Sequence, residues 1–247
     1  MILAFQQWSA PPVLMLLCLL LIFNGKVERT VDVEYVEVFA GVAEISKACR
    51  AHGMVGSSHD LAYSPHYDLC GRTGFLMAVN ELLRAVPGSL CVFALCCNSY
   101  CRMSRATSGR GILCPLGDMS RKFVREGNLL ASRLILMLWI CASRGLIWLV
   151  EQPEGSVFNL HPRWQEFVAH CPVPRQNLTN MFVSKNQQWL LPKGIHIAMF
   201  LVVWHPKRAP TTLKIYQQKF GKTLLEHVIV RIFLVEKPTG ELPQIYI

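Results

Sequence analysis

The sequence has 247 residues, of which 52% are hydrophobic and 17% are charged. This composition excludes a largely disordered chain and supplies enough apolar side chains for the core of one α/β domain. The 25 Lys and Arg residues outnumber the 16 Asp and Glu residues, giving a net charge of +9 that favours an anionic partner such as nucleic acid, a nucleotide or a membrane surface.

Residues 1–30 form an apolar leader around the unbroken apolar run 13–23. The run is shorter than the roughly 20 residues of a membrane-spanning helix and matches the central region of a signal peptide. Two alternatives stay open: a targeting or membrane-associating segment, and an N-terminal helix that is buried against the rest of the protein.

The ten cysteines are scattered without the spacing of a disulfide framework, and Cys49 and Cys141 fall in apolar stretches. This pattern predicts reduced thiols and an intracellular protein, nuclear or cytoplasmic. Membrane or secretory targeting by the leader is the alternative.

Strands and helices are predicted to alternate over residues 31–165. Four strands are predicted: 33–39, a short segment that ends at Asp60, 89–95, and a segment that ends at Glu151. Three helices are predicted between them: one that ends near Gly53, one over 75–86 and one over 128–143. This alternation predicts an α/β fold with a doubly wound, mostly parallel sheet. Residues 166–247 are predicted to be an irregular C-terminal part with strands over 195–204 and 227–236 and a basic segment between them.

Candidate binding residues lie where these strands end, because ligands of such sheets bind beyond the carboxyl ends of the strands. Gly41 ends the first strand in a turn that opens a helix, and glycine there lets a ligand approach the backbone. Asp60, about twenty residues later, is placed to accept hydrogen bonds from ribose hydroxyls, and Asp68 is a further candidate. Ordinary packing of the turn and solvated aspartates are the alternatives.

The stretch FALCCNSYCRMSRATSGR, residues 93–110, opens a long polar loop over 96–126. Its thiols admit three interpretations: a zinc site, inert side chains, or one nucleophile whose pKa is lowered by neighbouring arginines. Paired C-x-x-C motifs are absent, so no metal site is predicted. The cysteines and arginines concerned are Cys91, Cys96, Cys97, Cys101, Cys114, Arg102, Arg105 and Arg110.

Glu151 ends a buried strand in the stretch WLVEQPEGS. A partly desolvated carboxyl at that place can stay protonated and share its proton with a substrate ring nitrogen. A glutamate facing solvent is the alternative. The pair Cys97 and Glu151 is more informative than either residue alone.

In order, EVFAGVAEIS, ALCCNSYCRMSRATSGR, GNLLASR and EQPEGS resemble the motif series of the cytosine-C5 methyltransferase family over about Val33 to Arg163. The resemblance implies a Rossmann-like methyltransferase fold that binds S-adenosyl-L-methionine. It places Cys97 as the nucleophile, which attacks C6 of a flipped-out cytosine, and Glu151 as the group that hydrogen-bonds N3. The implied cofactor-binding residues lie in the first strand and its turn, at Glu37, Phe39, Ala40 and Gly41, and they join the candidates Asp60 and Asp68 already named.

The resemblance also implies a nucleic-acid partner, DNA or RNA with DNA favoured, and Arg102, Arg105 and Arg110 are the candidate phosphate contacts. The chain departs from the family pattern at Cys96, where proline is usual, at Gln152-Pro153, where Asn-Val is usual, and at Ala43, where a second glycine is usual. The alternative is therefore a catalytically inactive module of the same fold that binds nucleic acid or protein and associates with a membrane through residues 13–23.

Overall fold

The computed structural model describes residues 1–26, 30–152 and 156–171. Four parallel strands form one sheet in the order β2-β1-β3-β4. The strands are β1 (Val33–Val38), β2 (Gly56–His59), β3 (Ala85–Ala94) and β4 (Ile147–Glu151). The α/β fold with a doubly wound parallel sheet is confirmed.

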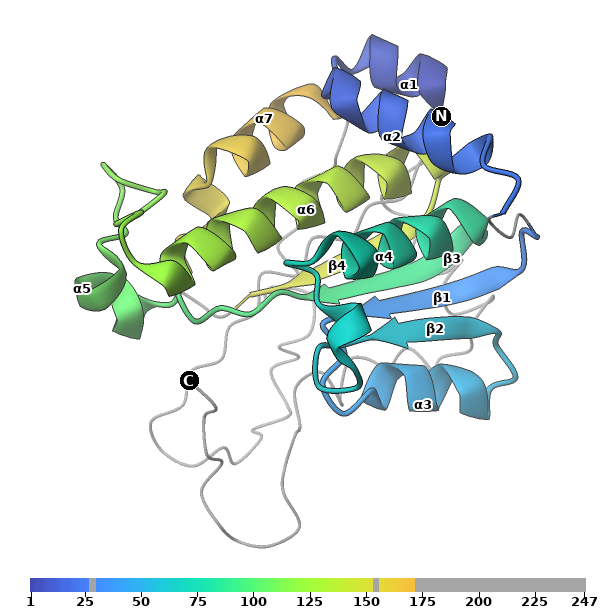
Figure 1. Ribbon diagram of the computed structural model, residues 1–247, viewed down its shortest axis with the longest axis horizontal. Coiled ribbons are helices and arrows are strands. Elements are labelled where there is room, and N and C mark those ends of the chain that lie inside the picture. The colour runs from blue at the N-terminus through green and yellow to red at the C-terminus, as the bar shows by residue number, and fades with distance from the viewer. Residues whose placement is uncertain (27–29, 153–155, 172–247) are drawn as a thin grey trace, which may run out of the picture.

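Helices cover both faces of the sheet (Figure 1). The helix α3 (Glu44–Ala51) packs on one face, and α4 (Arg72–Arg84) and α6 (Lys122–Arg144) pack on the other. Shorter elements follow the strands or lie outside α6: η1 (Pro65–Tyr67), η2 (Arg102–Ser104), α5 (Arg105–Ser108), η3 (Phe158–Leu160) and α7 (Pro162–His170).

The central strands are apolar on both faces, as a sheet covered on both sides requires. Val36 and Val38 of β1 join the large core beneath α4 and α6, whereas Tyr35 lies on the opposite face with Ile45 and Cys49 of α3. This alternation follows from the two-residue period of a strand.

The N-terminal leader forms two helices, α1 (Ile2–Gln7) and α2 (Pro12–Ile22). Phe5, Leu14 and Cys18 are fully buried in the large core, and the Trp8 ring lies 6.4 Å from the ring of Trp139 in α6. One side of the leader is thus part of the domain core. A second stripe of α2 is exposed: Val13, Leu16, Leu20 and Phe23.

Within the described ranges, α6 alone has the length and apolar composition of a membrane-crossing helix, and 56% of its apolar window is buried inside the protein. It has the position of a core helix, because it packs on the sheet, on α4 and on α1.

Two predicted boundaries are wrong. The helix predicted over 75–86 covers Arg72–Arg84, and β3 begins at Ala85, which pairs with Val33. Pro87 disfavours the helical conformation for Val86, so the chain becomes extended before the proline instead of stopping at it. The predicted helix 128–143 begins earlier, at Lys122, because its first turns are polar and carry no apolar period that a sequence pattern can show.

The predicted strands 195–204 and 227–236 and the basic segment between them lie outside the described residues. The boundary predicted at residue 165 falls inside α7, whose Trp164 and Phe167 both belong to the large core.

Candidate functional site

The topology defines where a ligand would lie. The chain passes from β1 outward to β2 and then returns to place β3 on the other side of β1. In sheets with such a reversal, ligands bind beyond the carboxyl ends of the two central strands. The turn after β1 and the segment from Leu95 to Cys97 after β3 lie at those ends, and α5 lies beyond the end toward which the strands point (Figure 1).

The turn between β1 and α3 has an uncommon backbone. Phe39, Gly41 and Ala43 all have positive φ angles, of 61°, 52° and 56°. Phe39 and Ala43 are not glycines, and side chains in this region store strain that concentrates at ligand-binding sites. A Cβ atom added to Gly41 would meet nothing within 4 Å, so the backbone there is open to an approaching group.

Asp60 at the end of β2 is joined to this turn. Its carboxylate accepts hydrogen bonds from the backbone N–H of Gly41 and of Ala62, each at 2.8 Å. The backbone N–H of Ala40 in turn donates to the carbonyl of His59 at 3.1 Å. The structure therefore brings the predicted residues Ala40, Gly41 and Asp60 together.

Glu37 is buried and points toward α3. Its carboxylate accepts hydrogen bonds from the backbone N–H of Ser46 at 2.8 Å and from its hydroxyl at 2.5 Å. Burial raises the pKa of Glu37, and the hydrogen bonds from Ser46 oppose that rise. Glu37 thus ties the first turn of α3 to β1, and its carboxylate is occupied by the protein itself.

Asp68 also has a local partner. Its carboxylate accepts a hydrogen bond from the backbone N–H of Cys70 at 2.8 Å, and its carbonyl accepts one from Gly71. These contacts shape the loop that leads into α4.

An aromatic group beside Asp60 was missed by sequence reasoning. The ring of Tyr67 stands edge-on to the rings of His59 and Tyr63, at centroid distances of 5.3 and 6.3 Å. Tyr63 is 42% exposed, and burial together with the nearby carboxylates of Glu37 and Asp60 raises its pKa. The signal in the sequence was the recurrence of aromatic residues at positions 59, 63 and 67.

Cys97 begins a tight turn after β3. Its carbonyl accepts hydrogen bonds from the backbone N–H groups of Tyr100 and Cys101, at 2.8 and 2.9 Å. Burial raises the pKa of the Cys97 thiol to about 11, and the charges of Cys101 and Glu151 add to the rise. The prediction that neighbouring arginines lower this pKa is wrong, because burial dominates.

Glu151 ends β4 beside the strand that leads to Cys97. Its Cα is the register partner of Ala94, three residues before Cys97. Burial raises the pKa of the Glu151 carboxyl, which favours its protonated form. The carboxylate lies close enough to Cys97 to affect the thiol, so these two predicted residues share one end of the sheet.

Gln152 connects the two strand ends. Its side-chain amide donates to the carbonyl of Leu95 at 2.6 Å and accepts a hydrogen bond from the hydroxyl of Ser156 at 2.9 Å. The backbone N–H of Val157 donates to the carbonyl of Tyr100 at 2.9 Å. In the sequence Gln152 was only a departure from a motif, and its bridging contacts become visible in three dimensions.

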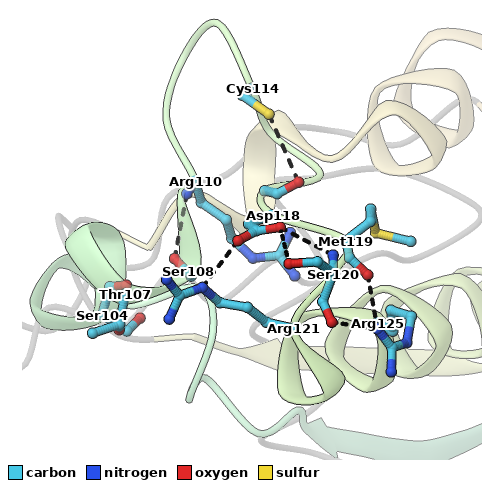
Figure 2. A network of polar contacts seen from close by, with 11 residues as sticks. Ser104, Thr107, Ser108, Arg110, Cys114, Asp118, Met119, Ser120, Arg121 and Arg125 are labelled. Carbon is cyan, nitrogen blue, oxygen red and sulfur yellow. Dashed lines mark hydrogen bonds and ion pairs between the residues drawn. The ribbon is translucent and has the colours of Figure 1, made fainter.

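The three predicted phosphate contacts divide into two groups. Arg102 and Arg105 are exposed on η2 and α5. Arg110 is only 3% exposed, and its guanidinium is turned into the protein beneath the loop (Figure 2). Arg110 therefore has an internal role and offers no surface to a phosphate.

The loop after Arg110 is held by its own polar contacts (Figure 2). The carboxylate of Asp118 accepts hydrogen bonds from the backbone N–H and the hydroxyl of Ser120, and it forms an ion pair with Arg121 at 3.0 Å. The hydrogen bonds from Ser120, and then those from Arg121, lower the pKa of Asp118. Arg125 donates to the carbonyls of Met119 and Ser120. These contacts organise residues 118–125, where the loop leads into α6.

All ten cysteines carry free thiols, and Cys96 and Cys114 are exposed. Across residues 1–26, 30–152 and 156–171, no group of three His, Cys, Asp or Glu side chains is placed to hold a metal ion. Cys101 donates to the hydroxyl of Ser104 at 3.3 Å.

Comparisons of the chain with protein-family models, with curated proteins and with solved structures find no match.

Proposed function

We propose that this protein is a methyltransferase-like enzyme that binds S-adenosyl-L-methionine and methylates C5 of cytosine in nucleic acid, with DNA as the favoured substrate. The observation that carries the proposal is the placement of Cys97 and Glu151 at neighbouring strand ends, at the same edge of the sheet as the strained turn at Gly41. The motif resemblance described above names the reaction.

The residues around Gly41 suit a nucleoside-containing ligand. The open backbone at Gly41 admits close approach, and the Asp60 carboxylate keeps lone pairs for ribose hydroxyls beside its bonds to Gly41 and Ala62. The partly exposed ring of Tyr63 offers an apolar surface for a purine. Glu37 supports α3 in this proposal and does not touch the ligand.

Cys97 and Glu151 would act on the target base. The cofactor supplies an electrophilic methyl group when it is bound. The Cys97 thiol gives its proton to solvent water, and its sulfur forms a bond to C6 while protonated Glu151 gives its proton to N3, which makes C5 nucleophilic. After C5 has gained the methyl group, water takes the C5 proton, the electrons of that C–H bond restore the double bond between C5 and C6, and sulfur leaves C6 as a thiolate that regains a proton from solvent. N3 then returns its proton to Glu151.

Covalent trapping tests this proposal. We expect the protein, incubated with S-adenosyl-L-methionine and duplex DNA containing 5-fluorocytosine, to form an adduct that survives denaturation, because fluorine at C5 blocks the final elimination. Cys97→Ser should abolish the adduct, and Cys96→Ser, which changes the exposed neighbouring thiol, should preserve it. An adduct that persists in Cys97→Ser would refute the assignment of the nucleophile. The proposal would also be refuted if calorimetry showed that the protein binds the cofactor and yet no adduct formed.

One observation favours a second candidate, a non-catalytic module of the same fold. The thiol of Cys97 has a pKa of about 11, so only about one molecule in 10⁴ carries the thiolate at pH 7 before a substrate binds. The non-catalytic candidate predicts salt-sensitive DNA binding that is unchanged by Cys97→Ser and by Glu151→Gln. Equilibrium binding of a DNA duplex by the unchanged protein, Cys97→Ser and Glu151→Gln, measured at two salt concentrations beside the trapping experiment, separates the two candidates: equal binding by all three proteins with no covalent adduct supports the module.

A further inference from the structure

Arg110 is a buried cation without a carboxylate partner. It is 3% exposed, and no ion pair joins it to an acidic side chain in the described part of the chain. Burial lowers its pKa, as expected for a charge taken out of water. Because a buried charge is costly, its persistence needs a compensating set of contacts.

The guanidinium obtains those contacts from three separate segments. One terminal nitrogen donates to the hydroxyl of Ser99 at 3.0 Å and to the carbonyl of Val124 at 3.2 Å. The other donates to the carbonyl of Pro115 at 2.7 Å and to the side-chain oxygen of Asn128 at 2.9 Å. Arg110 therefore joins the turn that begins at Cys97, the exposed loop and the first turns of α6.

The Cys97 turn also packs on the guanidinium. The central carbon of Arg110 lies 3.9 Å from the centroid of the fully buried Tyr100 ring. The hydroxyl of Tyr100 donates to the carbonyl of Gly127 at 3.1 Å and lies 3.2 Å from the side-chain oxygen of Asn128. Ser99 is thus hydrogen-bonded to Arg110, and Tyr100 contacts both Arg110 and its partner Asn128.

Close approach at this place depends on two glycines. A Cβ atom at Gly127 would collide with the hydroxyl of Ser99, and one at Gly117 would lie 2.7 Å from Cγ of Arg110. Gly117 also has a positive φ of 67°. The absence of a side chain at Gly117 and at Gly127 thus leaves space for the Arg110 side chain and for its partner Ser99.

We propose that Arg110 is a positioning residue that fixes the Cys97 turn against α6 and keeps the Cys97 sulfur at the sheet end beside Glu151. Arg110 acts through Ser99 and Tyr100 and touches neither reacting atom. Its value for catalysis rests on the function proposed above, but its effect on the geometry of the thiol does not.

The proposal predicts a specific change in the chemistry of Cys97. The thiol is hard to ionise because the packed turn shields it from water. Releasing the turn would hydrate the sulfur, and its pKa would move from about 11 toward the ordinary value for cysteine, with about a tenfold increase in thiolate for each unit.

The rate of alkylation of Cys97 by iodoacetamide, followed from pH 7 to pH 11 by peptide mass spectrometry, tests this without cofactor or DNA. Arg110→Lys removes the planar guanidinium with its several donors but keeps the positive charge. Ser99→Ala is a smaller change that removes only the hydroxyl to which Arg110 donates. We expect at least a tenfold faster reaction of Cys97 at pH 8 in Arg110→Lys, and a smaller increase in Ser99→Ala. Cys96 is the internal control for reagent access.

Arg144→Lys is the matched control, because Arg144 is a half-buried arginine at the far end of α6 and donates to the carbonyl of Ala85 at the start of β3. It should leave the Cys97 profile unchanged. An unchanged Cys97 profile in Arg110→Lys, or an equal change in Arg144→Lys, would overturn the proposal; if Arg110→Lys does not fold, the Ser99→Ala profile decides in the same way. A failure of the cytosine adduct would bear on the proposed function only.

Discussion

Two turns meet at the same edge of the sheet and are built in opposite ways. The turn after β1 is open at Gly41 and carries strained backbone at Phe39 and Ala43. The turn after β3 is closed, with Tyr100 fully buried and Arg110 and Gln152 bonded to its residues. The first turn has the properties of a surface that receives a ligand, and the second has those of a frame that holds one side chain in place.

The two turns are stabilised by different kinds of contact. In the open turn, one carboxylate, Asp60, joins the strand ends, and strain remains in the backbone. In the closed turn, the two terminal nitrogens of a buried cation donate to hydroxyl, amide and carbonyl oxygens, its Nε has no hydrogen-bond partner, and an aromatic ring packs against it. Substitutions should therefore have large effects in the closed turn and small or stabilising effects in the open one.

The largest effect is expected for Arg110→Ala. Its loss leaves the buried oxygens of Ser99 and Asn128 without their donor and opens a cavity beside Tyr100, so the free energy of unfolding should fall by about 4 kcal/mol. Chemical denaturation measures this. Arg102→Ala, on the exposed part of the same loop, should change the value by less than about 0.5 kcal/mol; equal effects would contradict the comparison.

The second effect concerns two buried histidines, one in each half of the molecule. Burial lowers the pKa values of His59, beside the open turn, and of His161, at the start of α7, to about 4. Because these values lie below the ordinary value of 6.5, each neutral histidine contributes stability that is complete above pH 6.5 and is lost as the pH falls through 4. Each contribution is about 3 kcal/mol.

Denaturant unfolding of His59→Gln and His161→Asn between pH 7 and pH 4 isolates these contributions. Each variant should show a shallower loss of stability on acidification than the unchanged protein. The raised pKa values of Glu37 and Glu151 act in the opposite direction, losing stability as the pH rises, and are common to all three proteins. Parallel pH profiles would show that the histidines do not titrate as their burial requires.

A smaller effect of opposite sign is expected in the open turn. Ala43 has a φ of 56°, which glycine adopts without strain, so Ala43→Gly should raise the free energy of unfolding by about 0.5 kcal/mol. Ala48→Gly in the middle of α3 is the control and should lower it by about 1 kcal/mol. A loss of stability in both variants would show that the turn at Ala43 is not strained.

The smallest effect is expected for Glu151→Gln. The fraction of Glu151 that is ionised at pH 8 adds to the rise of the Cys97 pKa, and Glu151→Gln removes that charge, so alkylation of Cys97 at pH 8 should become faster by at most about twofold. Glu37→Gln, at the open turn, should have no effect on this rate. A slower reaction in Glu151→Gln would contradict the proximity of the two side chains.

Much of the fold could be predicted from the sequence. Apolar runs predicted β1, β3 and β4, because burial on both faces of a parallel sheet imposes continuous apolar stretches, whereas the polar edge strand β2 was predicted from its position between a helix and Asp60. The start of β3 and the start of α6 were missed, since both depend on partners: Ala85 pairs with Val33, and the polar first turns of α6 are fixed by the loop and by Arg110.

The candidate site divides in the same way. Gly41, Asp60, Cys97 and Glu151 were predicted from the sequence because each ends or follows a strand, and strand ends of a parallel sheet gather at one edge. The burial of Arg110, the bridge made by Gln152 and the occupied carboxylate of Glu37 were decided only by the tertiary structure. A pattern of residues records which groups are present, whereas solvent access and hydrogen-bond partners depend on segments far apart in the chain.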